Sequence, residues 1–185
     1  MHYIRGLDSK NYYGKRGMVL EEDINETNRY YLDNDIAIIY KKPTPIKILK
    51  LDYSTNKITN AFFETQSTLD YNGVYKGRYI EFDAKETNNK TSFPIANIHM
   101  HQLKHIENII RNKGICFLIV RFNLINKTYL LIGRDLLDFI KKEERKSIPL
   151  SFFEDNCEKL ELKYSPRLDY IKIIDKYMEE IWKIL

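Results

Sequence analysis

Residues 79–85, which read Tyr-Ile-Glu-Phe-Asp-Ala-Lys, constrain the fold of this chain more than any other segment. Alternation of apolar and charged side chains with a period of two predicts a β-strand, because successive side chains of a strand point to opposite faces. The apolar face carries Ile80, Phe82 and Ala84. The charged face carries Glu81, Asp83 and Lys85. Such a strand must lie in a sheet that buries one face in a core and gathers charged groups on the other.

The segment before this strand predicts its hairpin partner. A turn at Lys76-Gly77 would place Asp70 directly opposite Asp83, and side chains paired in this way lie about 5 Å apart at Cβ. Two carboxylates at that spacing repel each other, so the pairing favours a bound cation such as Mg²⁺ between them. Lys85, two residues along the same face, adds a second positive group near this point.

A second register is compatible with the same residues. Asn72-Gly73 is the stronger turn signal by composition, and a turn there would place Asp70 opposite Tyr75. The charged face would then be an ordinary solvated surface. The residues themselves leave both registers open.

The remaining pattern predicts a single α/β domain with a mixed central sheet flanked by helices. We expect a flexible basic arm over residues 1–16 and one domain over residues 17–185. The expected strands are residues 36–40, 46–51, 57–63, 70–74, 78–86, 115–122 and 128–132, and the expected helices are residues 18–34, 98–112, 134–145 and 168–184. A hairpin over about residues 43–66 could project from the body of this domain.

Positive charge is concentrated in two segments of a chain whose net charge is only +4. Residues 1–20 hold four basic side chains and one acidic, and residues 40–60 hold five basic and one acidic. Such clusters are typical of a surface that binds a phosphate backbone, although a solvated tail and an ordinary Lys-rich hairpin explain the charge equally well. The candidate phosphate contacts are Lys41, Lys42, Lys47, Lys50 and Lys57 with Arg5, Lys10, Lys15 and Arg16, and Phe63 is the candidate for stacking on a base.

Other classes of protein are excluded by the composition. The longest apolar run, Ile115–Val120, has six residues, far fewer than the roughly 20 of a membrane span. Residues 1–17 have no apolar core of a secretory signal, so we expect a cytoplasmic protein that does not enter a membrane. We expect the two cysteines, Cys116 and Cys157, to be reduced.

The spacing of the acidic residues resembles a known nuclease signature. Asp70 followed by Asp83-Ala84-Lys85 is similar to the PD-(D/E)xK pattern of the restriction-endonuclease-like fold. The sequence segments around this pattern are more specific for one family. The segments 67–79 (STLDYNGVYKGRY), 84–87 (AKET), 90–94 (KTSFP) and 101–102 (HQ), with Pro43-Thr44-Pro45-Ile46 upstream, resemble the RecU family of Holliday junction resolvases.

The resemblance implies roles for individual residues. Thr68, Asp70, Asp83 and Gln102 match the magnesium-site positions of the family, and Mn²⁺ is a possible substitute for Mg²⁺. Lys85 matches the lysine that stabilises the transition state, and Glu21 matches an accessory acidic residue. Residues 43–66 match the stalk with which the family engages the centre of a junction. In one departure the family usually has Glu where this chain has Asp83, which puts the rate and the preferred metal in doubt.

We therefore expect a Mg²⁺-dependent, structure-selective endonuclease that resolves four-way DNA junctions in recombination and repair. Two symmetric nicks need two sites, so we expect a homodimer; recombinase and branch-migration proteins are candidate partners. Two alternatives stay open: a duplex-cutting nuclease of the same fold, and a junction-binding regulator without catalytic activity.

Overall fold

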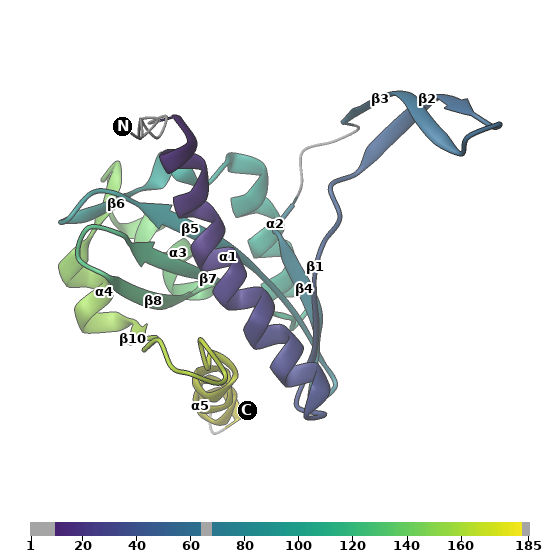
Figure 1. The fold of residues 1–185 in the computed structure, drawn as a ribbon. Helices are drawn as coiled ribbons and strands as arrows, with labels where there is room; N and C mark the ends of the chain where they lie inside the picture. The colour runs from purple at the N-terminus through teal and green to yellow at the C-terminus, as the bar shows by residue number, and fades with distance from the viewer. Residues whose placement is uncertain (1–9, 64–67, 183–185) are drawn as a thin grey trace, which may run out of the picture.

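The computed structural model describes residues 10–63 and 68–182, with side chains described from residue 19 to residue 179. Six strands form a mixed sheet in the order β1-β4-β5-β7-β8-β10 (Figure 1). These strands are β1 (Ile38–Lys41), β4 (Tyr71–Tyr75), β5 (Arg78–Thr87), β7 (Ile115–Phe122), β8 (Lys127–Ile132) and β10 (Glu158–Lys159). β5 and β7 pair in parallel and the other neighbours in this sheet pair antiparallel, so the expected α/β class with a mixed sheet is confirmed.

Helices cover both faces of the sheet. One face carries α1 (Lys10–Asp33) and α5 (Ile171–Trp182), and the other carries α2 (Met100–Arg111), α3 (Gly133–Lys142) and α4 (Leu150–Asn156). Two further short strands, β6 (Ser92–Pro94) and β9 (Ser147–Pro149), pair with each other, and a 3₁₀ turn, η1 (Ile95–Asn97), leads toward α2. The sheet is therefore the middle of three layers, with a separate core on each side.

The central strand β7 explains the apolar run in the sequence. All eight of its residues are buried, because helices cover it from both sides. A row of rings crosses the sheet on the α1 face: Tyr71 stacks on Phe82 at 4.8 Å between ring centroids, and Phe82 stacks on Phe117 at 4.6 Å. These three residues are direct cross-strand partners, and their packing holds β4, β5 and β7 in register.

A buried ionic network fixes α1 on its face of the sheet. Asp23 is 4% exposed and pairs with Arg121 of β7 at 2.8 Å and with Arg167 at 3.0 Å. Two arginines around one buried carboxylate compensate its desolvation. The position of Glu21, half a turn earlier on the same helix, follows from this anchor.

The basic hairpin stands away from the domain. β2 (Ile46–Asp52) and β3 (Lys57–Phe63) form a two-stranded sheet of their own, whose residues are exposed or half-buried, and Figure 1 shows it projecting from the body. Asp52 holds the turn, because its carboxylate accepts hydrogen bonds from Ser54 and Thr55, and Asn56 adopts a positive φ of 53°. The protruding two-stranded stalk expected from the sequence is confirmed.

Several element boundaries differ from those expected. Within the described residues α1 starts at Lys10 rather than at Met18, so residues 10–16, which were expected to belong to the basic arm, are part of this helix. The short elements β6, β9, β10 and α4 were not predicted, since two to seven residues are too few to display a period. Cys116 and Cys157 are free thiols, as expected. Within the described ranges, no helix is long and apolar enough to cross a membrane.

Candidate active site

The turn at Lys76-Gly77 sets the register of the β4–β5 hairpin. Both residues have positive φ, 46° and 73°, as a two-residue type I′ turn requires. Tyr71 pairs with Phe82 and Tyr75 with Arg78, so Asp70, one residue before β4, faces Asp83. The first of the two registers is therefore confirmed.

Gly73 explains why the competing turn does not form. It lies inside β4 opposite Ile39 of β1, and a Cβ built on it would lie 2.0 Å from the carbonyl oxygen of Ile38. Glycine is needed here because the two backbones approach too closely for a side chain. The Asn-Gly pair thus marks a close strand contact and does not mark a turn.

Asp83 is fully buried and only one of its carboxylate oxygens has a partner. Its Oδ2 accepts a hydrogen bond from Gln102 Nε2 at 2.7 Å and pairs with Lys85 Nζ at 2.8 Å. Its Oδ1 is buried without a hydrogen-bond partner among the described residues. Burial, and then the hydrogen-bonding and negative charge of Asp83, raise the pKa of Asp70 to about 6. The two carboxylates are therefore close neighbours, and the positive charges of Lys85 and Lys41 offset only part of this rise in the pKa of Asp70.

These groups fit a hard divalent cation. Mg²⁺ prefers oxygen ligands, commonly takes only one or two carboxylates, and keeps several waters. In the described part of the chain, no group of three or more His, Cys, Asp and Glu side chains is arranged to hold a metal. The orphaned Oδ1 of Asp83 is the atom that such a cation would satisfy.

Gln102 contacts both Asp83 and Thr68. Gln102 stands in the first turn of α2 and is 5% exposed. Its Nε2 donates to Asp83 and to the carbonyl oxygen of Thr68, at 2.7 and 2.9 Å, while its Oε1 accepts from the backbone N–H of His99 at 3.2 Å. The amide therefore orients Asp83 and the 68–70 segment together.

Glu21, the expected accessory acid, makes its contacts away from the two aspartates' own partners. No hydrogen bond or ion pair joins it to either of them among the described residues. It pairs instead with Lys41 of β1, at 2.6 Å between Nζ and Oε2. After burial, the negative charge of Glu21 is the largest cause that raises the pKa of Tyr71, so its charge does reach the end of β4.

Glu81 is the buried acid whose importance the sequence did not reveal. It is 1% exposed and lies on the same face of β5 as Asp83. Its carboxylate contacts Lys42, Thr68, Tyr79 and His105. Burial alone would raise the pKa of Glu81, but the hydrogen bonds from Lys42, Tyr79 and His105 lower it below the usual value. The period-two pattern did place Glu81 on this face, and that pattern was the signal available.

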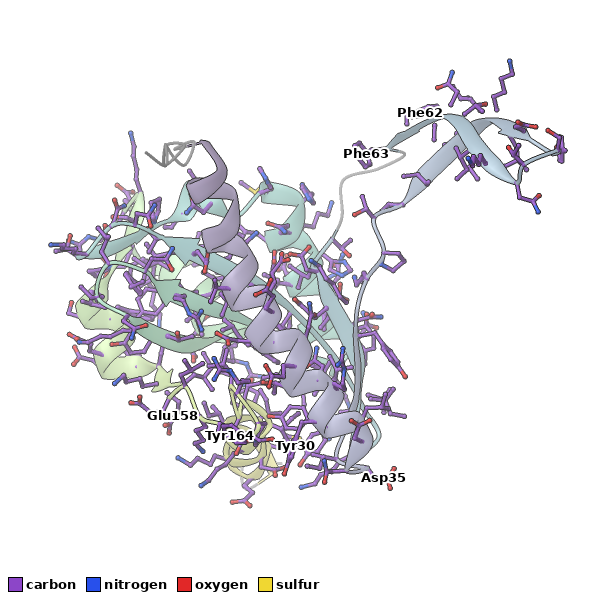
Figure 2. The ribbon with its side chains drawn as sticks, viewed as in Figure 1. Tyr30, Asp35, Phe62, Phe63, Glu158 and Tyr164 are labelled. Carbon is purple, nitrogen blue, oxygen red and sulfur yellow. The ribbon has the colours of Figure 1, made fainter. Side chains whose placement is uncertain are left out.

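The residues expected to contact DNA divide between the hairpin and its root. Lys47, Lys50 and Lys57 lie on the exposed hairpin, where Phe63 is 75% exposed (Figure 2). Lys41 and Lys42, at the root, have their ammonium groups engaged by Glu21 and Glu81. Arg5 lies outside the described residues, and so do the side chains of Lys10, Lys15 and Arg16.

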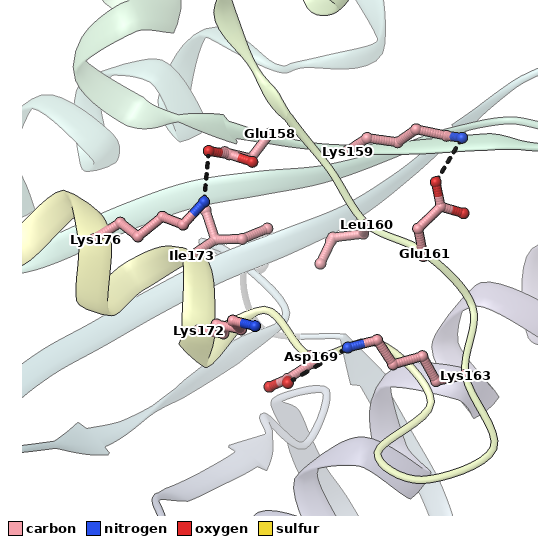
Figure 3. A pocket seen from close by; sticks show the side chains of 9 residues that line it. All are labelled: Glu158, Lys159, Leu160, Glu161, Lys163, Asp169, Lys172, Ile173 and Lys176. Carbon is pink, nitrogen blue, oxygen red and sulfur yellow. Dashed lines mark hydrogen bonds and ion pairs between the residues drawn. The ribbon is translucent and has the colours of Figure 1, made fainter.

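A pocket elsewhere on the protein is a weaker candidate for the functional site. It has a volume of about 150 Å³, lies between β10 and α5, and is lined by acids and lysines (Figure 3). Lys176 pairs with Glu158, and Lys163 with Asp169. Most of its charges are therefore matched within the pocket.

The mixed sheet, with two facing carboxylates and a lysine on one side, is consistent with the restriction-endonuclease-like fold expected from the sequence. The family model "Recombination protein U" (RecU) matches residues 15–176. The Holliday junction resolvase RecU of Pediococcus pentosaceus is 51% identical over 175 residues, which are 91% of this chain and 87% of the relative. The protein of the same name from Geobacillus kaustophilus is 50% identical over 169 residues, 88% and 84% of the two chains. This chain therefore belongs to the RecU family.

Proposed function

We propose that this chain is a Mg²⁺-dependent endonuclease that resolves four-way DNA junctions by paired, symmetric nicks. The names of its relatives support a four-way DNA junction as the substrate. The two carboxylates and the lysine support metal-assisted hydrolysis of a phosphodiester as the reaction. The observation that carries the proposal is the buried, unpartnered Oδ1 of Asp83, on a residue whose side chain lies close enough to Asp70 to raise the pKa of that carboxyl group. Mn²⁺ has similar ligand preferences, so we expect it to substitute.

The roles of the residues follow from their contacts. Asp70 and Asp83 would hold Mg²⁺, with Thr68 and Gln102 as the neighbouring members of the site. The cation would supply a Lewis acid and a bound water of lowered pKa. Lys85 stands 2.8 Å from Asp83 and is 17% exposed in its side chain, so its ammonium group can reach a phosphate and stabilise the charge that develops in the transition state. Glu21 contributes negative charge from α1.

The hairpin supports selectivity for a branched substrate. Lys47, Lys50 and Lys57 can neutralise phosphates, and Phe63 can stack on a base left unpaired where arms meet. Because the hairpin projects from the sheet, it would reach the centre of a junction while the carboxylates meet an arm. The basic residues Arg5, Lys15 and Arg16 are proposed as a second contact with the backbone.

Two nicks related by symmetry require two active sites, so we infer a homodimer. An exposed apolar row on the sheet supports this inference. Ile38, Val74 and Tyr79 are consecutive cross-strand partners and are 53%, 50% and 40% exposed. A second copy seated on this row would lie next to the carboxylates. Since the substrate is DNA, we place the activity in the cytoplasm, where recombinase and branch-migration proteins would be its partners.

A cleavage experiment tests the proposed function. We expect the parent chain with Mg²⁺ to cut a synthetic four-way junction into two nicked duplexes and to leave a linear duplex of the same sequence intact. Asp70→Asn should bind the junction and cut it at least about 100-fold more slowly, because it loses a metal-binding carboxylate. Equal cleavage of junction and duplex would support the duplex-cutting alternative. Tight binding without cleavage in Mg²⁺ or Mn²⁺ would support the non-catalytic one.

A further inference from the structure

Glu81 joins the two ends of the segment that carries the hairpin. Lys42 lies just before this insertion and Thr68 lies just after it. The ammonium group of Lys42 donates to Glu81 Oε1 and, at 2.7 Å, to Thr68 Oγ1. Thr68 Oγ1 in turn donates to Glu81 Oε1 at 3.1 Å. One buried carboxylate therefore holds both roots of the hairpin together.

The same carboxylate is held from two other elements. Tyr79 of β5 donates to its Oε2 at 2.6 Å, and His105 of α2 contacts its Oε1 at 2.9 Å. A buried charge with this many partners is rigid, because each partner restricts its rotamer and its removal leaves the others unsatisfied. Glu81 is thus a fixed point on the sheet.

The clamped roots carry the metal-site residues. The backbone N–H of Lys42 donates to the carbonyl oxygen of Asp70 at 2.7 Å. The carbonyl oxygen of Thr68 accepts from Gln102, whose amide also holds Asp83. The position of Asp70 relative to Asp83 therefore depends on bonds that begin at Glu81.

We propose that Glu81 is a positioning residue: by clamping Lys42 to Thr68, it sets the separation of Asp70 and Asp83 and links the orientation of the hairpin to that separation. The inference rests on the proposed function of the same site and assigns Glu81 no contact with the substrate. Its partner in this role is Lys42, whose charge is directed inward. DNA bound at the hairpin would then act on the carboxylates through the two roots.

The test uses Glu81→Gln, which keeps the size and an acceptor oxygen of the side chain but removes its charge. Mn²⁺ binding to the DNA-free protein is measured by isothermal titration calorimetry, and single-turnover cleavage is measured at saturating junction. We expect both Mn²⁺ affinity and cleavage rate to fall by about 10- to 100-fold, as for other residues that orient metal ligands. Junction affinity in EDTA should change by less than about 3-fold, since Glu81 is buried.

A matched control carries the same substitution on the surface. Glu107→Gln lies on α2, where the Glu107 side chain is 46% exposed and pairs with Arg111 at 3.7 Å. It should bind Mn²⁺ and cut like the parent. If Glu81→Gln also behaves like the parent in both assays, the proposal is overturned.

A double variant separates positioning from simple folding. Lys42→Met with Glu81→Gln removes both buried charges, which relieves the unpaired charge but still severs the clamp. We expect a folded protein, judged by its cooperative thermal unfolding, with Mn²⁺ affinity as weak as that of the single variant. Full recovery of Mn²⁺ binding would show that the ion pair only stabilises the fold. A parent that binds Mn²⁺ yet cuts no junction would contradict the proposed function and leave this inference standing.

Discussion

Glu81 and Asp83 are two residues apart on one face of one strand, but the surroundings of their carboxylates differ. Both oxygens of Glu81 have partners, whereas Oδ1 of Asp83 is buried without a hydrogen-bond partner among the described residues. Buried polar atoms in proteins are nearly always hydrogen-bonded. The unpartnered oxygen of Asp83, on a side chain near a second carboxylate, is therefore the atom on which the proposed cation site rests.

The raised pKa of Asp70 predicts how pH and Mg²⁺ act together. The folded protein holds this proton more tightly than the unfolded chain, because the pKa rises from 3.8 to about 6. The carboxyl group therefore stabilises the metal-free fold below about pH 4 and loses this contribution as the pH rises through about 6. Mg²⁺ needs the ionised form, so it should raise the unfolding temperature more at pH 7.5 than at pH 5.0.

Thermal unfolding with and without Mg²⁺ at both pH values checks this prediction. Asp70→Asn serves as the control, since it has no proton to lose and should show little Mg²⁺-induced shift at either pH. Equal shifts at pH 5.0 and 7.5 in the parent chain would contradict the pKa assigned to Asp70.

At this scale the sequence predicted the charged face better than the residues that support it. Alternation in residues 79–85 placed Asp83 and Lys85 on one face, but the residues alone left two registers open, and only the turn at Lys76-Gly77 puts Asp70 opposite Asp83. Gln102 could be assigned only by resemblance, because it comes from a helix whose packing on the sheet has no local signature. His105 and Lys42 converge on Glu81 through tertiary contacts between distant segments, which periodicity cannot reveal.

Two glycines of the β4–β5 hairpin serve different purposes, and alanine substitutions should separate them. Gly73→Ala places a Cβ 2.0 Å from a backbone oxygen of β1, so it should destabilise the fold by more than about 3 kcal/mol, at or beyond the upper end of overpacking costs. Gly77→Ala meets no atom within 4 Å but keeps a φ of +73°, which costs about 1–2 kcal/mol. Urea unfolding of both variants measures the difference. Equal losses would show that β1 does not approach β4 as closely as described.

The hairpin is an element whose contribution should appear in binding rather than in stability. Phe63 is 75% exposed, so Phe63→Ala should leave the free energy of unfolding unchanged. If its ring stacks on a base, the substitution should weaken junction binding by about 10-fold, the effect of losing one aromatic platform. Gel-shift titration measures this change.

Tyr164→Ala is the matched control for the hairpin, because Tyr164 is 94% exposed and lies far from the hairpin (Figure 2). It should bind a junction like the parent. If Phe63→Ala binds the junction with the affinity of the parent, Phe63 does not stack on a base.

Long elements were predicted well and short ones were not. Residues 115–122 form β7 with the expected bounds, since a strand buried on both faces is apolar at every position. α4 spans seven residues and β10 two, and pairing with neighbours distant in sequence decides that such segments form. The early start of α1 at Lys10 shows that a polar, basic segment without proline can still join a helix.

At the scale of the whole molecule, the two faces of the sheet differ: one packs against α1 and α5, and the other carries the two aspartates. α1 and α5 close one face through the aromatic core and the Asp23 network. On the other face α2 covers Asp83, which Gln102 holds, and the apolar row of Ile38, Val74 and Tyr79 is exposed farther along the same strands. The proposed dimer would bury this row.

The dimer can be tested at that row. Val74→Asp adds a charge to a side chain that is 50% exposed in the single chain, so the monomer should fold while a dimer that buries this residue should dissociate. We expect light scattering to report a dimer for the parent and a monomer for the variant. The variant should then nick one strand of a junction without the paired second cut. A variant that remains dimeric would place the interface elsewhere.

The most direct test of the central claim is a crystal structure of the protein with Mn²⁺, using the anomalous scattering of the metal. The account predicts a peak within coordination distance of both Asp70 and Asp83 Oδ1, about 2.0–2.3 Å from each oxygen, as expected for a small divalent cation. Lys85 should remain beside it, with Glu81 still bound to Lys42. The account would be contradicted by a fully occupied Mn²⁺ ion at a different set of residues. It would also be contradicted if, at saturating Mn²⁺, the two aspartates shared a proton and held no metal.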